Sequence, residues 1–234
     1  MAPRVLAAWL VHGYTASGAV MALLAAQDIF QYRYREAFLW LALQIVVDAT
    51  DGALARVVGV TRVLPGIRGA HLDDLVDYLT YVFVPALFVW RSLIVPSSWS
   101  LTVCSAMLVS SAYGFSRVDA KTDDHFFTGF PSYWNIVCLY LLLGGGTQAF
   151  NGTVLLVLAA LVFVPIRYIY PTRTAPLRGL TLALGSVWAA LVLLMIWRMP
   201  VRPRWSYWVS LVFPTYYVGL SLVLEWRRRT GAVA

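Results

Sequence analysis

Apolar residues run along this chain in stretches of about 17 to 25 residues, separated by charged residues, prolines and glycines. A helix needs about 20 residues to cross a hydrocarbon core of about 30 Å. The pattern therefore predicts eight transmembrane helices, at residues 11–30, 35–58, 70–94, 99–118, 133–149, 152–170, 179–199 and 205–226. The expected fold class is all-α, in a polytopic membrane protein.

The composition supports the membrane interpretation. The 234 residues are 60% apolar and 12% charged, with a mean hydropathy of +0.72, whereas about a quarter of the residues in a soluble domain are charged. Eight spans leave no room for a soluble domain, so residues 1–234 are expected to form a single integral membrane domain. Cys104 and Cys138 lie in apolar stretches without metal-ligand spacing, which excludes a disulfide scaffold.

The basic residues predict the orientation in the membrane. The formal net charge is +7, and 17 of the 18 cations are arginines scattered singly between apolar runs. Because they do not gather on one face, they favour a topological role over nucleic-acid binding. An even number of spans puts both termini on one side, which would carry twelve of the cations. The excess of positive charge on cytoplasmic loops then predicts cytoplasmic termini.

Acidic residues gather at the inferred cytoplasmic ends of the second, third and fourth spans. Eight of the eleven lie there: Asp48, Asp51, Asp73, Asp74, Asp77, Asp119, Asp123 and Asp124. A carboxylate in a membrane span is costly, so it is usually retained for a functional site or a paired interior contact. The concentration of carboxylates therefore predicts a site at the cytoplasmic interface.

Four of these carboxylates have the spacing of a shared site. Asp48 and Asp51 are three residues apart and Asp73 and Asp77 are four apart, so each pair lies on one helical face. A short loop joins the two spans as antiparallel neighbours and brings the four together. Four like charges repel unless cations neutralise them, and all-oxygen ligation suits Mg²⁺ or Mn²⁺. We therefore predict two divalent cations about 4 Å apart, which would bind phosphoryl oxygens.

Small residues beside the carboxylates leave helix surface bare. Gly52, Ala55 and Gly69 would let a flat ligand such as a nucleotide approach the backbone. Arg56 would offer a planar donor fork to a phosphate. The alternative is that these small residues merely let helices pack closely, as is common in membranes. Beside four carboxylates, the ligand interpretation is favoured.

The sequence resembles the signature of the CDP-alcohol phosphotransferases, integral membrane enzymes of phospholipid synthesis. Eight positions over 30 residues carry the resemblance: Asp48-x-x-Asp51-Gly52-x-x-Ala55-Arg56, then Gly69-x-x-x-Asp73-x-x-x-Asp77. The twelve residues between Arg56 and Gly69 form a longer spacer than most of the family has. That spacer, and eight spans in place of the family's usual number, resemble the bacterial phosphatidylcholine synthase branch, which joins choline to CDP-diacylglycerol.

The resemblance implies a role for each matching residue. Asp48, Asp51 and Asp73 would ligate metal, and Asp77 would ligate metal and act as general base on the incoming hydroxyl. The nucleotide contacts would be Gly52, Ala55, Arg56 and Gly69. Asp74 has no counterpart in the signature and is expected to point off the metal face. The implied reaction transfers a phosphatidyl group to choline with release of CMP, in the bacterial inner membrane, with manganese or magnesium.

A loop before the fifth span, residues 119–135, also resembles a segment of phosphatidylcholine synthases. Choline carries a quaternary ammonium that cannot donate an N–H hydrogen bond, so aromatic faces and an anion should recognise it. The candidates are Phe126, Phe127, Tyr133 and Trp134 with Asp123 or Asp124, and Tyr78 and Tyr81 are rivals close to Asp77. The alternative is an aromatic belt at the membrane interface.

Two other functions compete with choline transfer. The first is a sibling transferase that uses serine, glycerol phosphate or inositol phosphate. A phosphorylated acceptor would need a basic pocket, and the residues that could build one are Arg117, Lys121, Arg167 and Arg173. A choline or cation transporter would place its site near the bilayer midplane and often carries internal repeats, neither of which is seen. The expected partners are the two substrates and membrane lipid, with a homodimer left open and no nucleic acid.

Overall fold

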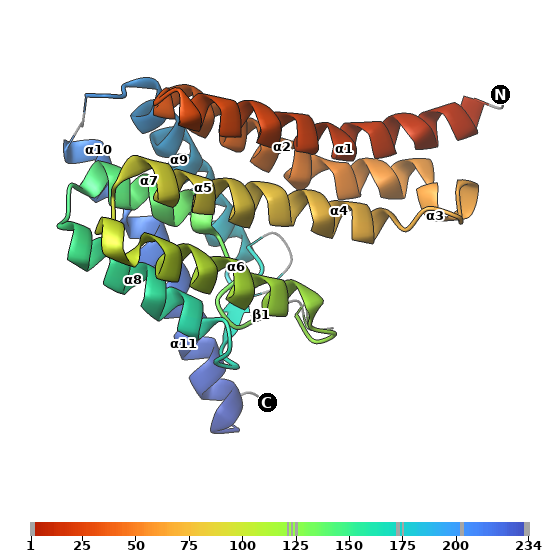
Figure 1. Ribbon diagram of the computed structural model, residues 1–234. Helices are drawn as coiled ribbons and strands as arrows, with labels where there is room; N and C mark the ends of the chain where they lie inside the picture. Colours follow the sequence, from red (N-terminus) through yellow and green to blue (C-terminus); the bar gives the residue numbers. More distant parts are fainter. Residues whose placement is uncertain are drawn as a thin grey trace. The chain divides into compact units, whose positions relative to one another are not determined.

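The computed structural model describes residues 3–120, 122, 124, 126–171, 174, 176–201 and 204–231, which are mostly helical (Figure 1). The chain divides into two compact units that interleave along the sequence. We call them the N-terminal unit, Met1–Leu93 with Trp134–Leu139, and the C-terminal unit, Ile94–Tyr133 with Tyr140–Ala234.

Long helices build the N-terminal unit. Its elements are α1 (Pro3–Phe30), α2 (Tyr34–Val58), α3 (Val60–Val63), α4 (Gly69–Asp77), the π-helical segment η1 (Tyr78–Phe83), α5 (Val84–Ser92) and the first part of α7 (Trp134–Gly144). The consecutive segments α4, η1 and α5 cover the third predicted span. The first span begins at Pro3 rather than at residue 11, because residues 5–10 continue the apolar pattern and proline is well tolerated in a first helical turn.

Helix α1 lies alongside α2, α4 and α5 (Figure 1). Its buried face repeats every three or four residues and is built largely of small side chains: Ala8, Val11, His12, Thr15, Gly18, Ala22, Ala25, Asp28 and Ile29. A Cβ atom on Gly18 would lie 2.3 Å from Gln44 Oε1 and 2.5 Å from Val76 Cγ1. Only glycine fits there, and the small face brings α1 close to the two helices that carry the predicted metal ligands.

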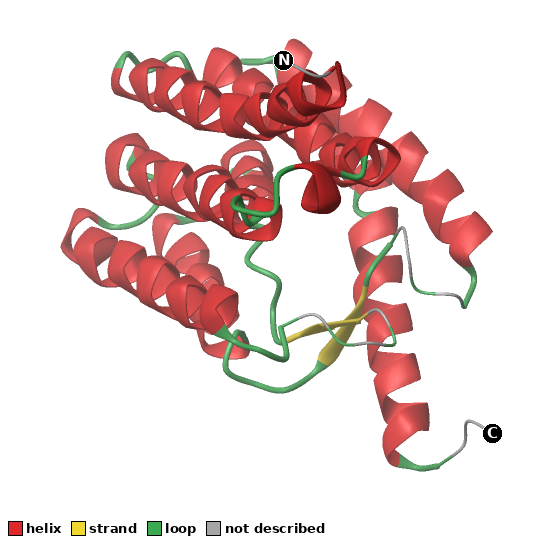
Figure 2. Ribbon diagram, turned by 90° about the vertical axis from the view of Figure 1, so that its right-hand side faces the viewer, coloured by secondary structure: helices red, strands yellow, loops and turns green. Residues whose placement is uncertain are grey.

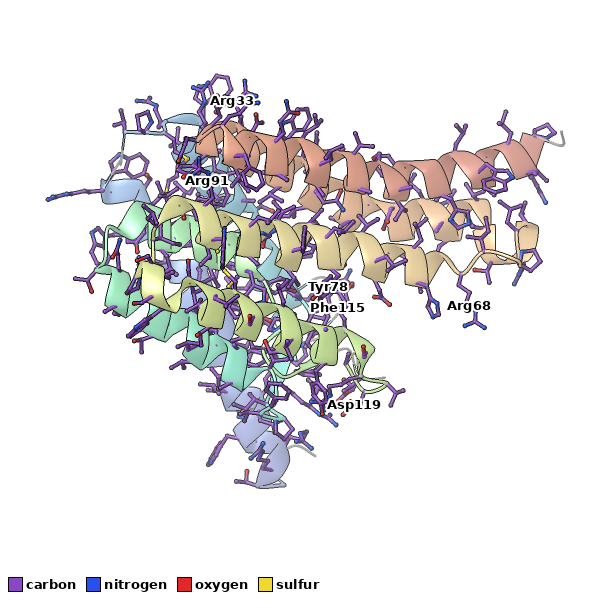
Figure 3. All side chains as sticks on the ribbon, in the orientation of Figure 1. Arg33, Arg68, Tyr78, Arg91, Phe115 and Asp119 are labelled. Carbon is purple, nitrogen blue, oxygen red and sulfur yellow. The ribbon has the colours of Figure 1, made fainter. Side chains whose placement is uncertain are left out.

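The two ends of the N-terminal unit carry different cations. Arg33 and Arg91 lie at one end and Arg68 lies at the other (Figure 3). At the first end, Arg33 forms an ion pair with the buried Asp28 of α1, and the Arg91 guanidinium lies 3.9 Å from the ring centroid of Tyr32. These contacts stabilise the turn between α1 and α2.

The C-terminal unit combines helices with a small sheet. It contains the 3-10 turn η2 (Ser97–Trp99), α6 (Ser100–Ser116), β1 (Phe126–Thr128), the rest of α7, α8 (Gln148–Leu161), β2 (Arg167–Ile169), α9 (Arg178–Trp197), α10 (Arg204–Ser210) and α11 (Val212–Arg229). Helix α6 lies against α8, and α11 lies against β2. The two strands lie side by side (Figure 2). They are antiparallel, with Phe127 opposite Tyr168.

The sheet and the end of α8 differ from the all-α expectation. A helix was expected over residues 152–170, but α8 ends at Leu161 and β2 follows. Pro165 explains the difference, because it lacks an N–H donor and disfavours helix at the residue before it. The last predicted span is also interrupted at Leu211, which separates α10 from α11, and Pro214 occupies the first turn of α11.

Among the described residues, four helical stretches are long and apolar enough to cross a membrane, judged by length and composition: Pro3–Phe30, Tyr34–Val58, Arg178–Trp197 and Arg204–Arg229. Two apolar helices are shorter, Trp134–Gly144 and Gln148–Leu161. The chain is therefore a mostly helical protein with several helices suited to a bilayer.

Candidate active site

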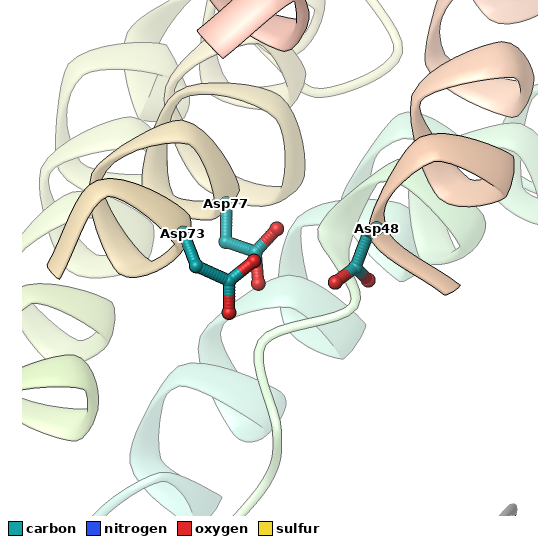
Figure 4. A group of neighbouring side chains, drawn as sticks. All are labelled: Asp48, Asp73 and Asp77. Atoms are coloured by element: carbon teal, nitrogen blue, oxygen red, sulfur yellow. The ribbon is translucent and has the colours of Figure 1, made fainter. Parts of the chain in front are cut away.

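Three of the four predicted metal ligands converge within the N-terminal unit. Asp48 comes from α2, and Asp73 and Asp77 come from consecutive turns of α4, so that their side chains face one another (Figure 4). One carboxylate oxygen from each residue lies within 4.8 Å of the others, and all three side chains are half-buried. The sequence spacing thus predicts the juxtaposition correctly.

The donor set fits a hard divalent cation. All three side chains offer carboxylate oxygens, which Mg²⁺ and Mn²⁺ prefer. Oxygen ligands on opposite sides of Mg²⁺ lie about 4 Å apart, so these carboxylates need only a small adjustment to share an ion. The arrangement could also neutralise the charge of a phosphate-bearing ligand once a cation is bound.

Asp51, the fourth predicted ligand, lies deeper in the helix packing. It follows Asp48 by one turn of α2 and is 7% exposed. The hydroxyl of Thr15 in α1 donates a hydrogen bond to Asp51 Oδ2 at 2.7 Å. Within the described residues, Asp51 is not part of the three-carboxylate group, and neither is Asp74, the neighbour of Asp73.

Tyr81 contacts the carboxylate group directly. Its hydroxyl donates a hydrogen bond to Asp48 Oδ2 at 2.7 Å, across 33 residues of sequence. Tyr81 is buried in η1, the π-helical segment that begins directly after Asp77. Such segments often occur at functional sites, and the wider turn changes which residues of the helix face α2. The sequence predicted Tyr81 as a choline contact, whereas the structure places its hydroxyl on a candidate metal ligand.

Two of the predicted nucleotide contacts face open space. A Cβ atom on Gly52 would meet only Arg56 Nη1 within 4 Å, at 3.4 Å. Arg56 itself is exposed, one turn further along α2. This part of α2 therefore has space at the backbone with a guanidinium beside it, and its role in binding a nucleotide stays a prediction.

The other two predicted nucleotide contacts pack against α1. Ala55 contacts a small apolar cluster formed by Ala8 and Val11 of α1 with Val60. A Cβ atom on Gly69 would lie 3.3 Å from Cε1 of the buried His12, which is tighter than most packing contacts. Both positions thus have packing partners in α1, and their role as nucleotide contacts stays a prediction.

Comparison with curated proteins finds relatives along nearly the whole chain. This chain is 36% identical over 220 residues to a phosphatidylcholine synthase of Pseudomonas aeruginosa, and the aligned region covers 94% of this chain and 91% of the relative. A phosphatidylcholine synthase of Rhizobium johnstonii is 34% identical over 218 residues, 93% of this chain and 90% of the relative. That of Legionella pneumophila is 42% identical over 168 residues, 71% of this chain and 66% of the relative. No protein-family model matches the chain.

This chain belongs to the phosphatidylcholine synthase family. Membership agrees with the resemblance found in the sequence and makes the chain a phosphatidyltransferase. Among the residues that the structure describes, the converging carboxylates of α2 and α4 form a group that could hold a metal ion.

The candidate choline contacts of this phosphatidylcholine synthase family member fall into two groups, one in each unit. Tyr78, Tyr81 and Trp134 belong to the N-terminal unit, where Trp134 is fully buried and offers no exposed face. The other described candidates belong to the C-terminal unit: Asp124, Phe126, Phe127 and Tyr133. Asp123 lies outside the described residues.

In the C-terminal unit, Phe127 forms the centre of an aromatic group. Its ring centroid lies 4.7 Å from that of Tyr170 and 6.4 Å from that of Tyr133. Tyr170 follows β2 in the segment that the sequence assigned to a helix, so it was missed as a candidate. Asp124 forms an ion pair with Arg167 at 2.8 Å, so its negative charge is already compensated.

The basic pocket expected for a phosphorylated acceptor is weakened by ion pairing. Arg117 donates two hydrogen bonds to Asp119, at 2.8 and 2.7 Å, and Arg167 pairs with Asp124. These hydrogen bonds from Arg117 hold the pKa of Asp119 below its ordinary value. Two further candidates lie outside the described residues: Lys121 and Arg173.

Proposed function

We propose that this chain transfers the phosphatidyl group of CDP-diacylglycerol to choline and releases CMP, using two divalent cations, Mn²⁺ or Mg²⁺. The observation that carries the proposal is the convergence of Asp48, Asp73 and Asp77 within 4.8 Å, in a member of the phosphatidylcholine synthase family. The name of the relatives supports choline as the acceptor, because phosphatidylcholine is the product that it states.

In the proposed reaction, Asp77 takes the proton from the hydroxyl of choline. The choline oxygen forms a bond to the phosphorus next to diacylglycerol, while the bond from that phosphorus to the CMP oxygen breaks. Asp48, Asp51 and Asp73, together with Asp77, would hold the cations, which supply neutralising charge to the pyrophosphate and to the departing CMP. The hydrogen bond from Tyr81 would keep Asp48 oriented toward this site.

The proposed nucleotide site lies beside the carboxylates on α2. Gly52 leaves open space in which CDP can approach the backbone, and the exposed Arg56 guanidinium can bind a phosphate. Ala55 and Gly69 complete the proposed nucleotide contacts, and their small size also lets α1 pack against α2 and α4.

The test of the function is an acceptor panel. Purified protein with CDP-diacylglycerol should release CMP when supplied with choline, and release little with serine, glycerol phosphate or inositol phosphate. A preference for another alcohol would replace choline with a sibling reaction. Choline flux into liposomes without any CMP release would overturn the enzyme proposal in favour of a transporter.

We further propose eight membrane spans in one integral membrane domain of the bacterial inner membrane, with cytoplasmic termini and a cytoplasmic active site. The other four spans would be residues 69–92, α6, α7 and α8, with neighbouring loop residues buried in protein where a helix is short. Helix α7, whose residues are divided between the two units, supports a single domain. Three arginines lie in the sequence between the carboxylates of α2 and those of α4: Arg56, Arg62 and Arg68. The positive-inside rule expects such an excess of basic residues on the cytoplasmic side.

This topology predicts which side of the membrane each end of the N-terminal unit faces. Arg35 and Arg68 are both exposed. Arg35 lies in the first turn of α2, and Arg68 directly precedes α4, at the opposite end of the N-terminal unit. An Arg68→Cys variant should react with a membrane-impermeant maleimide only in inside-out vesicles, and Arg35→Cys only in spheroplasts. The native Cys104 and Cys138 are buried and provide a low background. Reversed labelling would place the active site on the outer face.

Choline selectivity is proposed to depend on the aromatic group around Phe127. Replacing Phe127 with Leu should raise the KM for choline about thirtyfold, because a lost cation–π contact with a desolvated ammonium costs about 2 kcal/mol. The KM for CDP-diacylglycerol should hardly change, since its proposed contacts are on α2. Both constants would be measured from initial rates of CMP release.

A matched aromatic pair in the same unit provides the control. Phe163 lies 4.9 Å from Tyr113, centroid to centroid, and neither residue belongs to the 119–135 loop. Phe163→Leu should leave the KM for choline unchanged. If Phe127→Leu raises neither constant, or both equally, the loop is better explained as an interfacial aromatic belt.

A further inference from the structure

Thr15 of α1 contacts a candidate metal ligand although it lies far outside the carboxylate signature. Its hydroxyl lies 2.7 Å from Asp51 Oδ2, and both residues are 7% exposed. The preceding residue, Tyr14, forms a second hydrogen bond from α1 to α2, between its hydroxyl and that of Thr50 at 2.9 Å. Two consecutive residues of α1 thus reach two consecutive residues of α2.

Close packing of α1 makes the Thr15 contact possible. A threonine side chain is short, so its hydroxyl reaches a neighbouring helix only where the backbones approach closely. Gly18, one turn after Thr15, provides that approach, because its position against Gln44 and Val76 leaves no room for a Cβ atom. The sequence of α1 therefore places the Thr15 hydroxyl at Asp51.

The direction of the hydrogen bond follows from the chemistry of the two groups. An ionised carboxylate only accepts hydrogen bonds, so Thr15 is the donor. The backbone oxygen of Val11 is a much more distant acceptor, at 3.4 Å. A hydrogen bond to an ionised group is about twice as strong as one between neutral groups. Thr15 therefore restrains the Asp51 carboxylate through its Oδ2 atom.

We infer that Thr15 is a positioning residue of the metal site, which holds the Asp51 carboxylate in place for a divalent cation. The inference rests on the proposed function of Asp51 as a metal ligand. Partners that orient metal ligands in this way contribute about 10- to 100-fold to metal affinity. Helix α1, which carries none of the signature residues, would then be part of the site.

The test is the affinity of the purified full-length protein for Mn²⁺, measured in detergent from the electron paramagnetic resonance signal of the free ion. Thr15→Val, which has nearly the same shape but no hydroxyl, should weaken Mn²⁺ binding about 10- to 100-fold. Thr15→Ser keeps the hydroxyl and should bind Mn²⁺ nearly as the unchanged protein does. Tyr14→Phe removes the neighbouring hydrogen bond between α1 and α2 and should leave Mn²⁺ affinity unchanged.

A double variant separates this inference from the proposed function. Asp51→Ala should weaken Mn²⁺ binding by itself, and adding Thr15→Val should have no further effect, because Thr15 acts through Asp51. Weak binding in Asp51→Ala with normal binding in Thr15→Val would overturn the role of Thr15 alone. Normal Mn²⁺ binding and transfer in Asp51→Ala would instead overturn the assignment of Asp51. Equal losses in Thr15→Ser and Thr15→Val, or a loss in Tyr14→Phe, would show that helix packing rather than the hydroxyl is responsible.

Discussion

Replacing Asp48, Asp73 or Asp77 with Ala is expected to lower the rate of phosphatidyl transfer by at least about a thousandfold. Each residue offers one of three oxygens that lie within 4.8 Å of one another, so losing one removes a ligand from a shared group. A metal ion stabilises the charge of a phosphoryl-transfer transition state by several kcal/mol, and about 4 kcal/mol corresponds to about a thousandfold in rate. The measurement is CMP release by purified variants supplied with saturating choline and CDP-diacylglycerol.

Asp74 provides the matched control for these carboxylates. It lies one residue from Asp73 on α4 and is not part of the converging group, so Asp74→Asn should retain most of the activity. Unfolding temperatures of all variants would show that the inactive ones are folded. Near-normal turnover in two of the three alanine variants would contradict the metal assignment. An Asp74→Asn variant as inactive as Asp73→Asn would contradict the proposed face of α4.

The carboxylate group could be predicted from the sequence because it depends on short-range geometry. Asp73 and Asp77 share a face whatever surrounds the helix, and a short connection makes α2 and α4 antiparallel neighbours. Asp48 then meets them from the facing helix. The cost of burying carboxylates in a membrane provided an independent reason to expect a site there.

The partners of these carboxylates could not be predicted in the same way. The hydrogen bonds from Tyr81 to Asp48 and from Thr15 to Asp51 cross 33 and 36 residues. Both depend on how helices pack: one on the π-helical turn after Asp77, the other on the close approach of α1 at Gly18. Neither a single wider turn nor a helix crossing point leaves a signal in residue spacing.

The fold shows the same division between local pattern and packing. Long apolar runs located α2 and α9 well, and α1 apart from its first two turns, because a run of about 20 apolar residues specifies a helix by itself. The segment after α8 was assigned to a helix because hydropathy does not distinguish a short buried strand from a continuing helix. Pro165 marked the boundary, but the pairing of β2 with β1 joins segments about 40 residues apart and needs the tertiary structure.

Removing divalent cations with EDTA is expected to stop phosphatidyl transfer, and adding Mn²⁺ or Mg²⁺ should restore it. Without cations, three clustered carboxylates would face a pyrophosphate of the same sign. Two like charges about 4 Å apart repel by about 4 kcal/mol at the effective dielectric constant of a protein surface. The loss should therefore again be at least about a thousandfold. CMP release before chelation, after it and after addition of each metal measures the effect.

Two controls separate loss of metal from other effects of the chelator on a membrane protein. EDTA already saturated with Mn²⁺ should leave CMP release unchanged, because EDTA binds Mn²⁺ more tightly than Mg²⁺ and so has no capacity left to remove either ion. Asp48→Ala should not recover when metal is added back to the chelated protein, because a ligand rather than the ion is missing. Elemental analysis of the chelated protein would confirm that it is metal-free. Full activity in that metal-free protein would overturn the divalent-cation proposal, and the carboxylates would then need another role in binding choline.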